Sequence, residues 1–320
     1  MLFRTDAPYM KNLLFYRDFH GFTGGHLKVW DYFRHTKESA IFKASIHLTE
    51  SSLRDASNPW IANDETICRE WQPKNADILF VAGLDWNAVP EDYEKPIINL
   101  VQHIRHALPE DPRYAFLHRR ATRICVSQQV ADAIVSTGQV NGPVVTISNG
   151  LNLANLPVPA KKRDIPVLIA GYKEPNFAES LFNLLNSIGI KSLCLTTQLP
   201  RPEYLSLVAR SSVTVFLPNR IQGEGFYLPA IEGMALGSFV VCPDCVGNRD
   251  FCLNEVNCLQ PTYDLGSIVA SCQDALERIS NGSAESILSA AFHQVYQHSI
   301  EEERRLFLRV LSALLRSNSD

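Results

Sequence analysis

Two glutamates separated by seven residues, Glu224 and Glu232, are the side chains of this chain best suited to bind a ligand. Between them lies Pro229, which is favoured in the first turn of a helix because no backbone N–H donor is needed there. Gly237 marks the end of the segment, since glycine takes positive φ freely, and an apolar run follows. The pattern predicts a loop with Glu224, a short helix with Glu232, and then a strand.

A helix that begins between two carboxylates has the chemistry to bind a sugar nucleotide. Its first N–H groups lack helical partners and carry the positive end of the dipole, so they attract a diphosphate. The carboxylates accept hydrogen bonds from sugar and ribose hydroxyls. The alternative is that Glu224 is a solvated loop residue and that Glu232 only offsets the dipole of its own helix.

The complete motif runs Glu-Gly-Phe-x-Leu-Pro-x-x-Glu-x-Met-Ala-x-Gly from Glu224 to Gly237. It resembles the signature of the retaining nucleotide-sugar glycosyltransferases of family 4. The resemblance implies an α/β protein with the GT-B fold, in which two Rossmann-like, doubly wound domains have parallel sheets that face each other across a cleft.

The length of 320 residues suits two domains that each own a core. We expect an acceptor-side domain over residues 1–155, a donor-binding domain over 156–300, and a C-terminal helix over 301–320 that packs back across the domain boundary. Residues 153–164, with two prolines and three consecutive basic residues, form the expected linker. A net charge of −4 gives no general attraction to nucleic acid, which we exclude as a partner.

In the first half, apolar runs alternate with polar loops and helical spacing. A strand over 13–16 precedes a glycine-rich loop over 21–26 and a helix from Leu27. The next strands are expected over 39–48 and 77–83, and the long connection over 49–73 is either an acceptor-facing loop or a surface excursion. A strand over 96–103 ends on His103. Further strands at 121–127 and 142–150 flank a helix at 128–136.

The second half repeats the alternation of strand and helix. Strands are expected over 165–171, 192–196 and 213–218, with helices over 176–188, 202–210, 265–278 and 285–315. The last helix has an apolar stripe, which predicts packing against the protein or, as an alternative, contact with a membrane surface.

The resemblance assigns roles to individual residues. Glu224 is expected to contact hydroxyls of the transferred sugar, and Glu232 the ribose. Backbone amides around Gly225, Phe226, Tyr227 and Leu228, together with the loop at Gly24 and Gly25, are expected to approach the diphosphate. His103 matches a histidine near the donor sugar, and Lys173 lies where these enzymes place a cation; Glu224, His103 and Lys173 form the expected catalytic set.

The sequence departs from the family in its cations. After the glycine that ends the first strand of the second domain, family members usually have an arginine and then a lysine several residues on. In this chain that strand is expected over 165–171, and Gly171 is followed by Lys173 alone. Arg249, Arg220 and Lys28 are candidate substitutes, each with a solvated surface charge as the alternative. Arg249 is included in the expected donor-binding set.

No Asp-x-Asp occurs in the chain, so we predict a site that works without metal, and no cofactor is expected. Cys242, Cys245, Cys252 and Cys258 have a spacing possible for zinc, but structural thiols in a reducing compartment explain them better. A nicotinamide-dependent oxidoreductase would need a Gly-x-Gly-x-x-Gly fingerprint, which is absent.

The leading hypothesis is a retaining, metal-independent glycosyltransferase. It would move a sugar from a UDP- or GDP-sugar to a hydroxyl of a glycan or glycolipid, in the biosynthesis of a polysaccharide or similar glycan. The weak cation pattern leaves one alternative, a GT-B scaffold that binds a sugar nucleotide or a partner without turnover. The first residues lack the pattern of a signal peptide, and we expect a cytoplasmic protein, with contact to the inner face of the membrane as an option.

Overall fold

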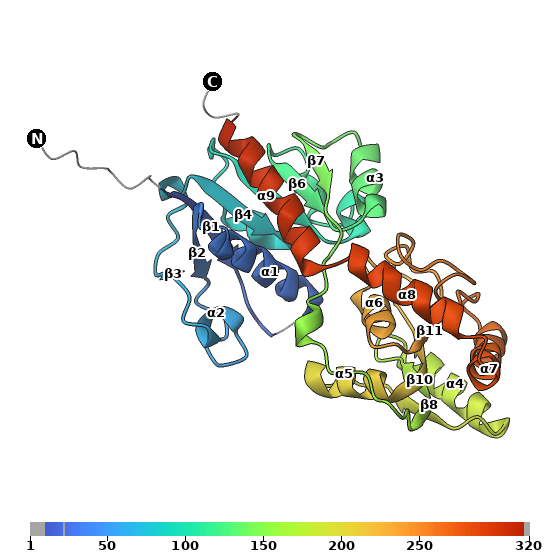
Figure 1. Ribbon diagram of the computed structural model, residues 1–320. Helices are drawn as coiled ribbons and strands as arrows, with labels where there is room; N and C mark the ends of the chain where they lie inside the picture. Colours follow the sequence, from blue (N-terminus) through green and yellow to red (C-terminus); the bar gives the residue numbers. More distant parts are fainter. Residues whose placement is uncertain (1–9, 22, 317–320) are drawn as a thin grey trace, which may run out of the picture. The chain divides into compact units, whose positions relative to one another are not determined.

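The computed structural model describes residues 10–21 and 23–316 (Figure 1). Contacts between Cα atoms divide the chain into two compact units. Unit 1 comprises the described residues up to Ile147 together with those from Glu303 on, and unit 2 comprises residues 148–302. By these contacts the last helix, from Glu303 on, belongs to unit 1 although it follows unit 2 in sequence.

Unit 1 contains a seven-stranded sheet in which all paired strands are parallel. The order across the sheet is β3-β2-β1-β4-β5-β6-β7. The strands are β1 (Lys11–Arg17), β2 (Phe42–Leu48), β3 (Ile67–Cys68), β4 (Ile78–Ala82), β5 (Ile97–Val101), β6 (Thr122–Cys125) and β7 (Val144–Thr146). Its helices are α1 (Gly24–Glu38), α2 (Pro59–Ala62), α3 (Gln128–Ser136) and most of α9 (Ile300–Arg316).

One face of this sheet is covered by α1 and α9, which lie side by side over the central strands (Figure 1). In the register of the sheet Phe15 on β1 is opposite Phe80 on β4, and the two rings stack with centroids 4.6 Å apart. Tyr32 of α1 meets Phe307 of α9 edge to face at 4.8 Å. Because side chains alternate along a strand, Leu79 on β4 packs on the opposite face.

That opposite face is covered by the connections between strands. Its buried cluster includes Leu14, Leu79 and Val81 from the sheet, with Trp86 from the turn after β4. The turn over Gly83–Ala88 is a 3₁₀ helix, and two further 3₁₀ helices, Ile104–Ala107 and Tyr114–Phe116, occupy the connection from β5 to β6. The carboxyl ends of β4 and β5 are therefore followed by short turns and loops.

Unit 2 is built on a four-stranded parallel sheet in the order β11-β10-β8-β9. The strands are β8 (Ile165–Ala170), β9 (Ser192–Leu195), β10 (Ser211–Phe216) and β11 (Phe239–Val241). The helices are α4 (Pro175–Ser187), α5 (Arg201–Arg210), α6 (Leu228–Ala235), α7 (Leu265–Asn281) and α8 (Glu285–Gln297). Helices α4 and α7 bury apolar residues against one face of the sheet, while α5 and α6 pack together and α8 contacts α6.

The alternation of strands and helices predicted from the sequence is confirmed, with several corrections to extent. Strand β2 begins at Phe42 rather than at residue 39, because Ala40 has a positive φ of 54°. The run over 142–150 forms a strand only at Val144–Thr146, and the connection over 49–73 contains α2 and β3. The single helix expected over 285–315 is two helices that meet at residues 298–299.

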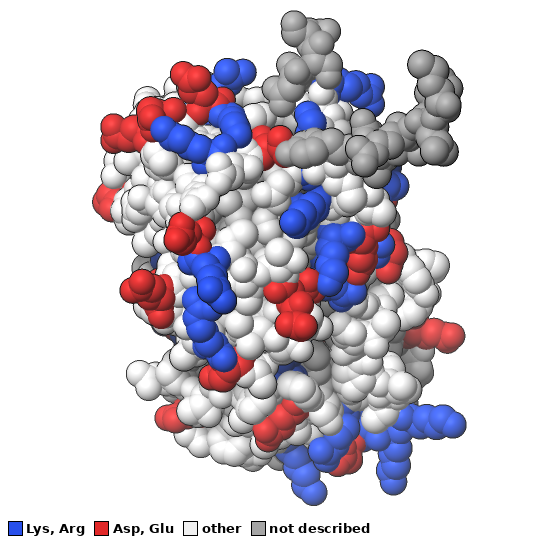
Figure 2. Space-filling model, turned by 90° about the vertical axis from the view of Figure 1, so that its left-hand side faces the viewer, with Lys and Arg blue, Asp and Glu red and all other residues white. Residues whose placement is uncertain are grey.

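The apolar stripe of α9 is used inside unit 1. Phe307 and Leu311 are fully buried and Val310 is nearly so, in line with the packing role expected from the sequence. No helix in the described part of the chain combines the length and the hydropathy needed to cross a membrane. On the face in Figure 2, basic and acidic side chains are interspersed over most of the described surface.

Candidate functional site

The loop, helix and strand predicted around the two glutamates are present in unit 2. Helix α6 has Pro229 in its first turn, and Gly237 follows its end with a φ of 68°. Strand β11 begins two residues later at Phe239. Glu224 lies on the loop before the helix and Glu232 within it, so the local prediction is confirmed.

A second loop supports the loop that carries Glu224. The Glu224 amide donates to the carbonyl of Cys245 and the Tyr227 amide to that of Gly247, each over 2.9 Å. A Cβ atom at Gly247 would lie 2.8 Å from backbone atoms of residues 224–226, so only glycine permits this approach. The sequence led us to expect the Tyr227 amide to face a ligand. In the structure it is already bonded within the protein.

Glu224 forms an ion pair with Lys173, which follows the end of β8. The Lys173 Nζ lies 2.5 Å from the Glu224 Oε1, with side chains 28% and 13% exposed. The ammonium also lies over the ring of Tyr227, 5.4 Å from its centroid. The structure thus brings Lys173 together with Glu224 and Tyr227, two predicted site residues that lie about 50 positions later in the sequence.

Glu232 has a different environment from Glu224. Its side chain is buried, and its Oε1 lies 2.5 Å from a guanidinium nitrogen of Arg201. Burial raises the pKa of the Glu232 carboxyl, and Arg201 opposes this rise. Sequence reasoning missed Arg201. The expected helix began at residue 202, whereas α5 includes Arg201 as its first residue, where the dipole disfavours a cation.

Three tyrosines, Tyr172, Tyr204 and Tyr227, are affected by the charges of these ion pairs. Burial, followed by the charges of Glu224 and Glu232, raises the pKa of Tyr172 to about 12. The pKa of Tyr204 and that of Tyr227 are also raised, again chiefly by burial. All three hydroxyls are therefore protonated at neutral pH and able to donate a hydrogen bond. Within the described parts of the chain, the buried Tyr204 hydroxyl has no hydrogen-bond partner.

The site residues predicted in the first half lie in unit 1. Gly24 and Gly25 open α1, and the Gly25 carbonyl accepts a hydrogen bond of 3.3 Å from the Gln102 side chain. His103 follows Gln102. Strand β5 ends at Val101 and not at His103, which instead precedes a 3₁₀ helix and accepts a 3.1 Å hydrogen bond from the Arg105 amide at its Nδ1. The glycine loop and the residues after β5 are therefore neighbours.

The three candidate substitute cations have partners of their own. Lys28 is fully buried in unit 1, with Nζ 2.7 Å from both Asp31 and Glu303, so the expectation that it substitutes for a diphosphate ligand is wrong. Arg249 forms two hydrogen bonds to the exposed Asp244, of 2.8 and 2.6 Å. Arg220 lies over the Tyr263 ring, 5.3 Å from its centroid, and forms an ion pair of 3.4 Å with Glu174.

The cysteines are all free thiols. The four considered for zinc, Cys242, Cys245, Cys252 and Cys258, are buried, and the Cys242 sulfur accepts a hydrogen bond of 3.4 Å from Asn248. Nowhere in residues 10–21 and 23–316 do three or more histidine, cysteine, aspartate or glutamate side chains gather as a metal ion requires.

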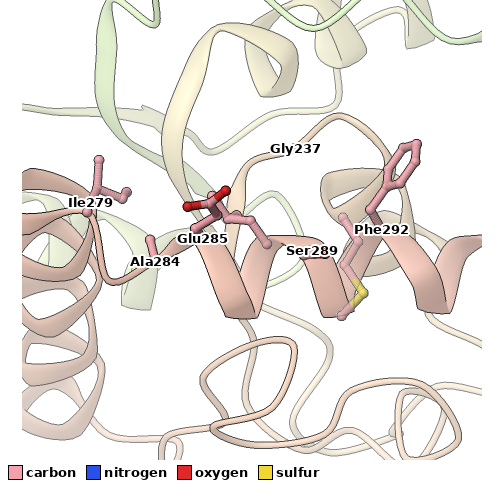
Figure 3. Close-up of a pocket in the computed structure, with 9 residues that line it drawn as sticks. Gly237, Ile279, Ala284, Glu285, Ser289 and Phe292 are labelled. Carbon is pink, nitrogen blue, oxygen red and sulfur yellow. The ribbon is translucent and has the colours of Figure 1, made fainter.

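A hollow of about 600 Å³ lies elsewhere on unit 2, between the end of α7 and α8 (Figure 3). Its wall consists mostly of apolar side chains, with Glu285 as its one charged residue among those that line it. The lining residues are Met234, Gly237, Ile279, Gly282, Ala284, Glu285, Leu288, Ser289 and Phe292. None of the predicted site residues is among them, so this hollow is separate from the cluster around the two glutamates.

No family model matches the chain. No curated protein matches it either. Solved structures do match over nearly their full length. Sucrose-phosphate synthase (tll1590) from Thermosynechococcus elongatus superposes with a TM-score of 0.70 at 13% identity, covering 96% of this chain and 100% of that one. A glycosyltransferase from Rickettsia africae gives 0.69 at 13% identity, covering 95% and 98%.

Anabaena Alr3699/HepE, solved in complex with UDP and glucose, has a TM-score of 0.66 at 14% identity and covers 95% of this chain and 100% of its own. At these identities the likeness concerns the fold. It agrees with the two parallel α/β sheets and with the architecture expected from the motif around Glu224. The chain has the GT-B fold.

Proposed function

We propose that this protein is a retaining glycosyltransferase that moves a sugar from a nucleotide-sugar donor to a hydroxyl of a glycan or glycolipid, without a metal ion. The observation that carries the proposal is the cluster at the start of α6, where a lysine and two glutamates border a helix N-terminus. The fold of Alr3699/HepE, which binds UDP and glucose, supports a UDP- or GDP-sugar as the donor.

Transfer requires that the departing diphosphate be stabilised as negative charge develops on it. Lys173 is the cation that we assign to this task. It is paired with Glu224, so donor binding would replace part of that pair with contacts to phosphate. Glu224, once released, would accept hydrogen bonds from the hydroxyls of the transferred sugar.

The remaining roles are proposed from the motif. Glu232 would bind the ribose, Gly24 and Gly25 would approach the diphosphate, and His103 would contact the sugar or the acceptor. Gly225, Phe226 and Leu228 belong to the same donor-binding loop and helix start, and Arg249 would need to leave Asp244 to take part. We assign no covalent nucleophile, because the leaving diphosphate can help to deprotonate the acceptor hydroxyl in a retaining transfer.

The test is release of nucleoside diphosphate from a panel of UDP- and GDP-sugars by the purified protein, with and without EDTA. Wild-type protein should hydrolyse or transfer at least one donor, and EDTA should not change the rate. Glu224→Gln should lower turnover about 100-fold, as expected when about 3 kcal/mol of charged hydrogen bonding is lost. Asp164→Asn, which alters an exposed carboxylate that pairs with Arg210 and has no role in the proposed site, is the matched control for charge.

Each outcome distinguishes the hypotheses. Binding of a sugar nucleotide with no turnover in the presence of any acceptor would favour the scaffold alternative. The observation that argues for this alternative is that only one cation of the expected pattern follows β8. Failure to bind every nucleotide and sugar nucleotide would overturn the proposal. Inversion at the anomeric carbon, measured by NMR of the product, would overturn retention alone.

A further inference from the structure

Glu232 is held by a residue outside its own helix. Its carboxylate, with the residue only 1% exposed, pairs with Arg201 on α5, whose side chain remains 39% exposed. A carboxylate that is buried needs a partner, and here the partner is a cation that also reaches solvent. The pair therefore links the buried acid of the motif to the surface of unit 2.

The position of Arg201 is not explained by helix stability. It is the first residue of α5, where the positive end of the helix dipole repels a cation. Arg210, at the other end of the same helix, is favoured by the dipole and pairs with the exposed Asp164, also at 2.5 Å. The two arginines thus offer a matched comparison within one helix.

Hydrogen-bonding capacity remains around this pair. A carboxylate accepts about four hydrogen bonds, and one guanidinium nitrogen uses only part of that capacity. Tyr172 and Tyr204 lie near enough to Glu232 for its charge to raise the pKa of both, and the buried Tyr204 hydroxyl has no hydrogen-bond partner within the part of the chain that the structure describes. The same region of unit 2 therefore holds an acceptor with spare capacity, Glu232, and a buried hydroxyl donor without a partner, Tyr204, as a ligand with hydroxyl groups requires.

We propose that Arg201 is a positioning residue for the nucleotide: it fixes the Glu232 carboxylate so that it accepts hydrogen bonds from the ribose hydroxyls of a nucleoside diphosphate. Tyr204 contributes a hydrogen bond to the same hydroxyls. The inference rests on the proposed function, since it concerns the donor of that reaction. Arg201 would also be a second cation near the donor, on α5, in addition to Lys173 in the segment after β8.

Ribose hydroxyls provide a direct test. Affinities of UDP and GDP are measured by calorimetry for wild-type protein, Arg201→Ala, Arg201→Lys and Arg210→Ala, together with the 2′,3′-dideoxy form of the nucleotide that binds. Arg201→Ala should bind the ribonucleotide at least about tenfold more weakly, as loss of a charged hydrogen-bond network predicts. It should bind the dideoxy form as tightly as the wild type does. Arg201→Lys should recover part of the loss, because it keeps the charge but not the planar guanidinium.

A pH series adds a readout that a purely structural role would not change. In Arg201→Ala the affinity for the ribonucleotide should fall as pH decreases, and should do so at higher pH than in wild type, because the cation that opposes protonation of Glu232 is gone. Tyr172 and Tyr204, whose pKa values are raised by burial and by the charge of Glu232, stay protonated throughout. Arg210→Ala should follow the wild-type curve.

Failure of this inference differs from failure of the proposed function. If wild-type protein binds neither UDP nor GDP, both are overturned. If it binds but Arg201→Ala binds equally well, or loses the same factor for the ribonucleotide and its dideoxy form, only the inference is overturned. Should Arg201→Ala fail to fold, as judged by its melting curve, Arg201→Gln of nearly equal length takes its place in the same comparison.

Discussion

Glu303 in unit 1 and Glu232 in unit 2 are buried to the same extent, each about 1% exposed, but their partners differ. Glu303 contacts Lys28 at 2.7 Å and His35 at 2.9 Å, and both partner side chains are buried. Burial lowers the pKa of Lys28, but Asp31 and Glu303 raise it, so the net direction is upward and the ammonium stays charged. The partner of Glu232 is half-exposed.

The difference separates a structural ion pair from one that we assign to ligand binding. Where every member is buried, the charges join one element to another, here α9 to α1, and a ligand has no access to them. Where the cation is partly exposed, its partner can be exchanged when a ligand arrives. The exposure of the cation, and not the burial of the acid, therefore distinguishes the two regions, and the predictions below test that distinction.

The largest effect is expected for Glu303→Ala. It leaves Lys28 buried without its partner from α9, and breaking a buried pair in this way costs about 3–5 kcal/mol of unfolding free energy. Chemical denaturation measures it. Glu303→Gln, which has nearly the same size and keeps a hydrogen-bond acceptor beside Lys28 and His35, should cost less than Glu303→Ala.

The control for Glu303 lies on the same two helices. Arg304 of α9 pairs with Glu38 of α1 at 3.0 Å, but both side chains are about one-third exposed. Arg304→Ala should change the unfolding free energy by less than about 1 kcal/mol. Equal effects for Glu303→Ala and Arg304→Ala would contradict the view that burial of both partners gives the first pair its structural role.

A second effect concerns pH and Asp85, which pairs with Arg17 at 2.9 Å in unit 1. Burial raises the pKa of Asp85 to about 6, against the opposing charge of Arg17, whereas an unfolded aspartate titrates near 3.9. Between these values the folded state binds more protons, so stability falls as pH rises through the interval. Between pH 4 and pH 7, the unfolding free energy of the wild type should fall by about 2–3 kcal/mol relative to that of Asp85→Asn.

The comparison with Asp85→Asn is needed because other groups oppose this slope. Burial, followed by the charge of Arg113, lowers the pKa of His106 to about 3, and that group favours folding more as pH rises. His106 is common to both proteins, so its effect cancels in the difference. A difference in unfolding free energy that stays constant with pH would show that Asp85 is ionised throughout, as an exposed pair would be.

The parts of the site that depend on neighbours in sequence were predictable. Pro229 and Gly237 fixed the ends of α6, and the polar loop before it placed Glu224, because turn and cap preferences act over a few residues. The order of strands and helices followed from the same kind of local pattern. The motif then identified the architecture.

Contacts between distant segments were not predictable from those patterns. Lys28 was misjudged because its helix gives no sign that Glu303, near the other end of the chain, lies against it. Arg201 was missed because its partner belongs to a different helix. The Tyr227 amide was expected to be free because nothing local shows that Gly247 approaches it. In each case the tertiary partner, and not the residue type, decides the role.

The smallest effect is expected for Lys173→Met, and it should appear in binding instead of stability. The Lys173 side chain is 28% exposed, so loss of its pair with Glu224 should change the unfolding free energy by about 1 kcal/mol or less. If Lys173 exchanges Glu224 for a diphosphate, affinity for UDP or GDP should fall about tenfold, while affinity for the corresponding nucleoside, which lacks phosphate, should not change. Calorimetry on the two ligands checks this. A loss of several kcal/mol in stability with unchanged affinity would place Lys173 with Lys28, as a structural cation, and would remove the distinction between the two regions.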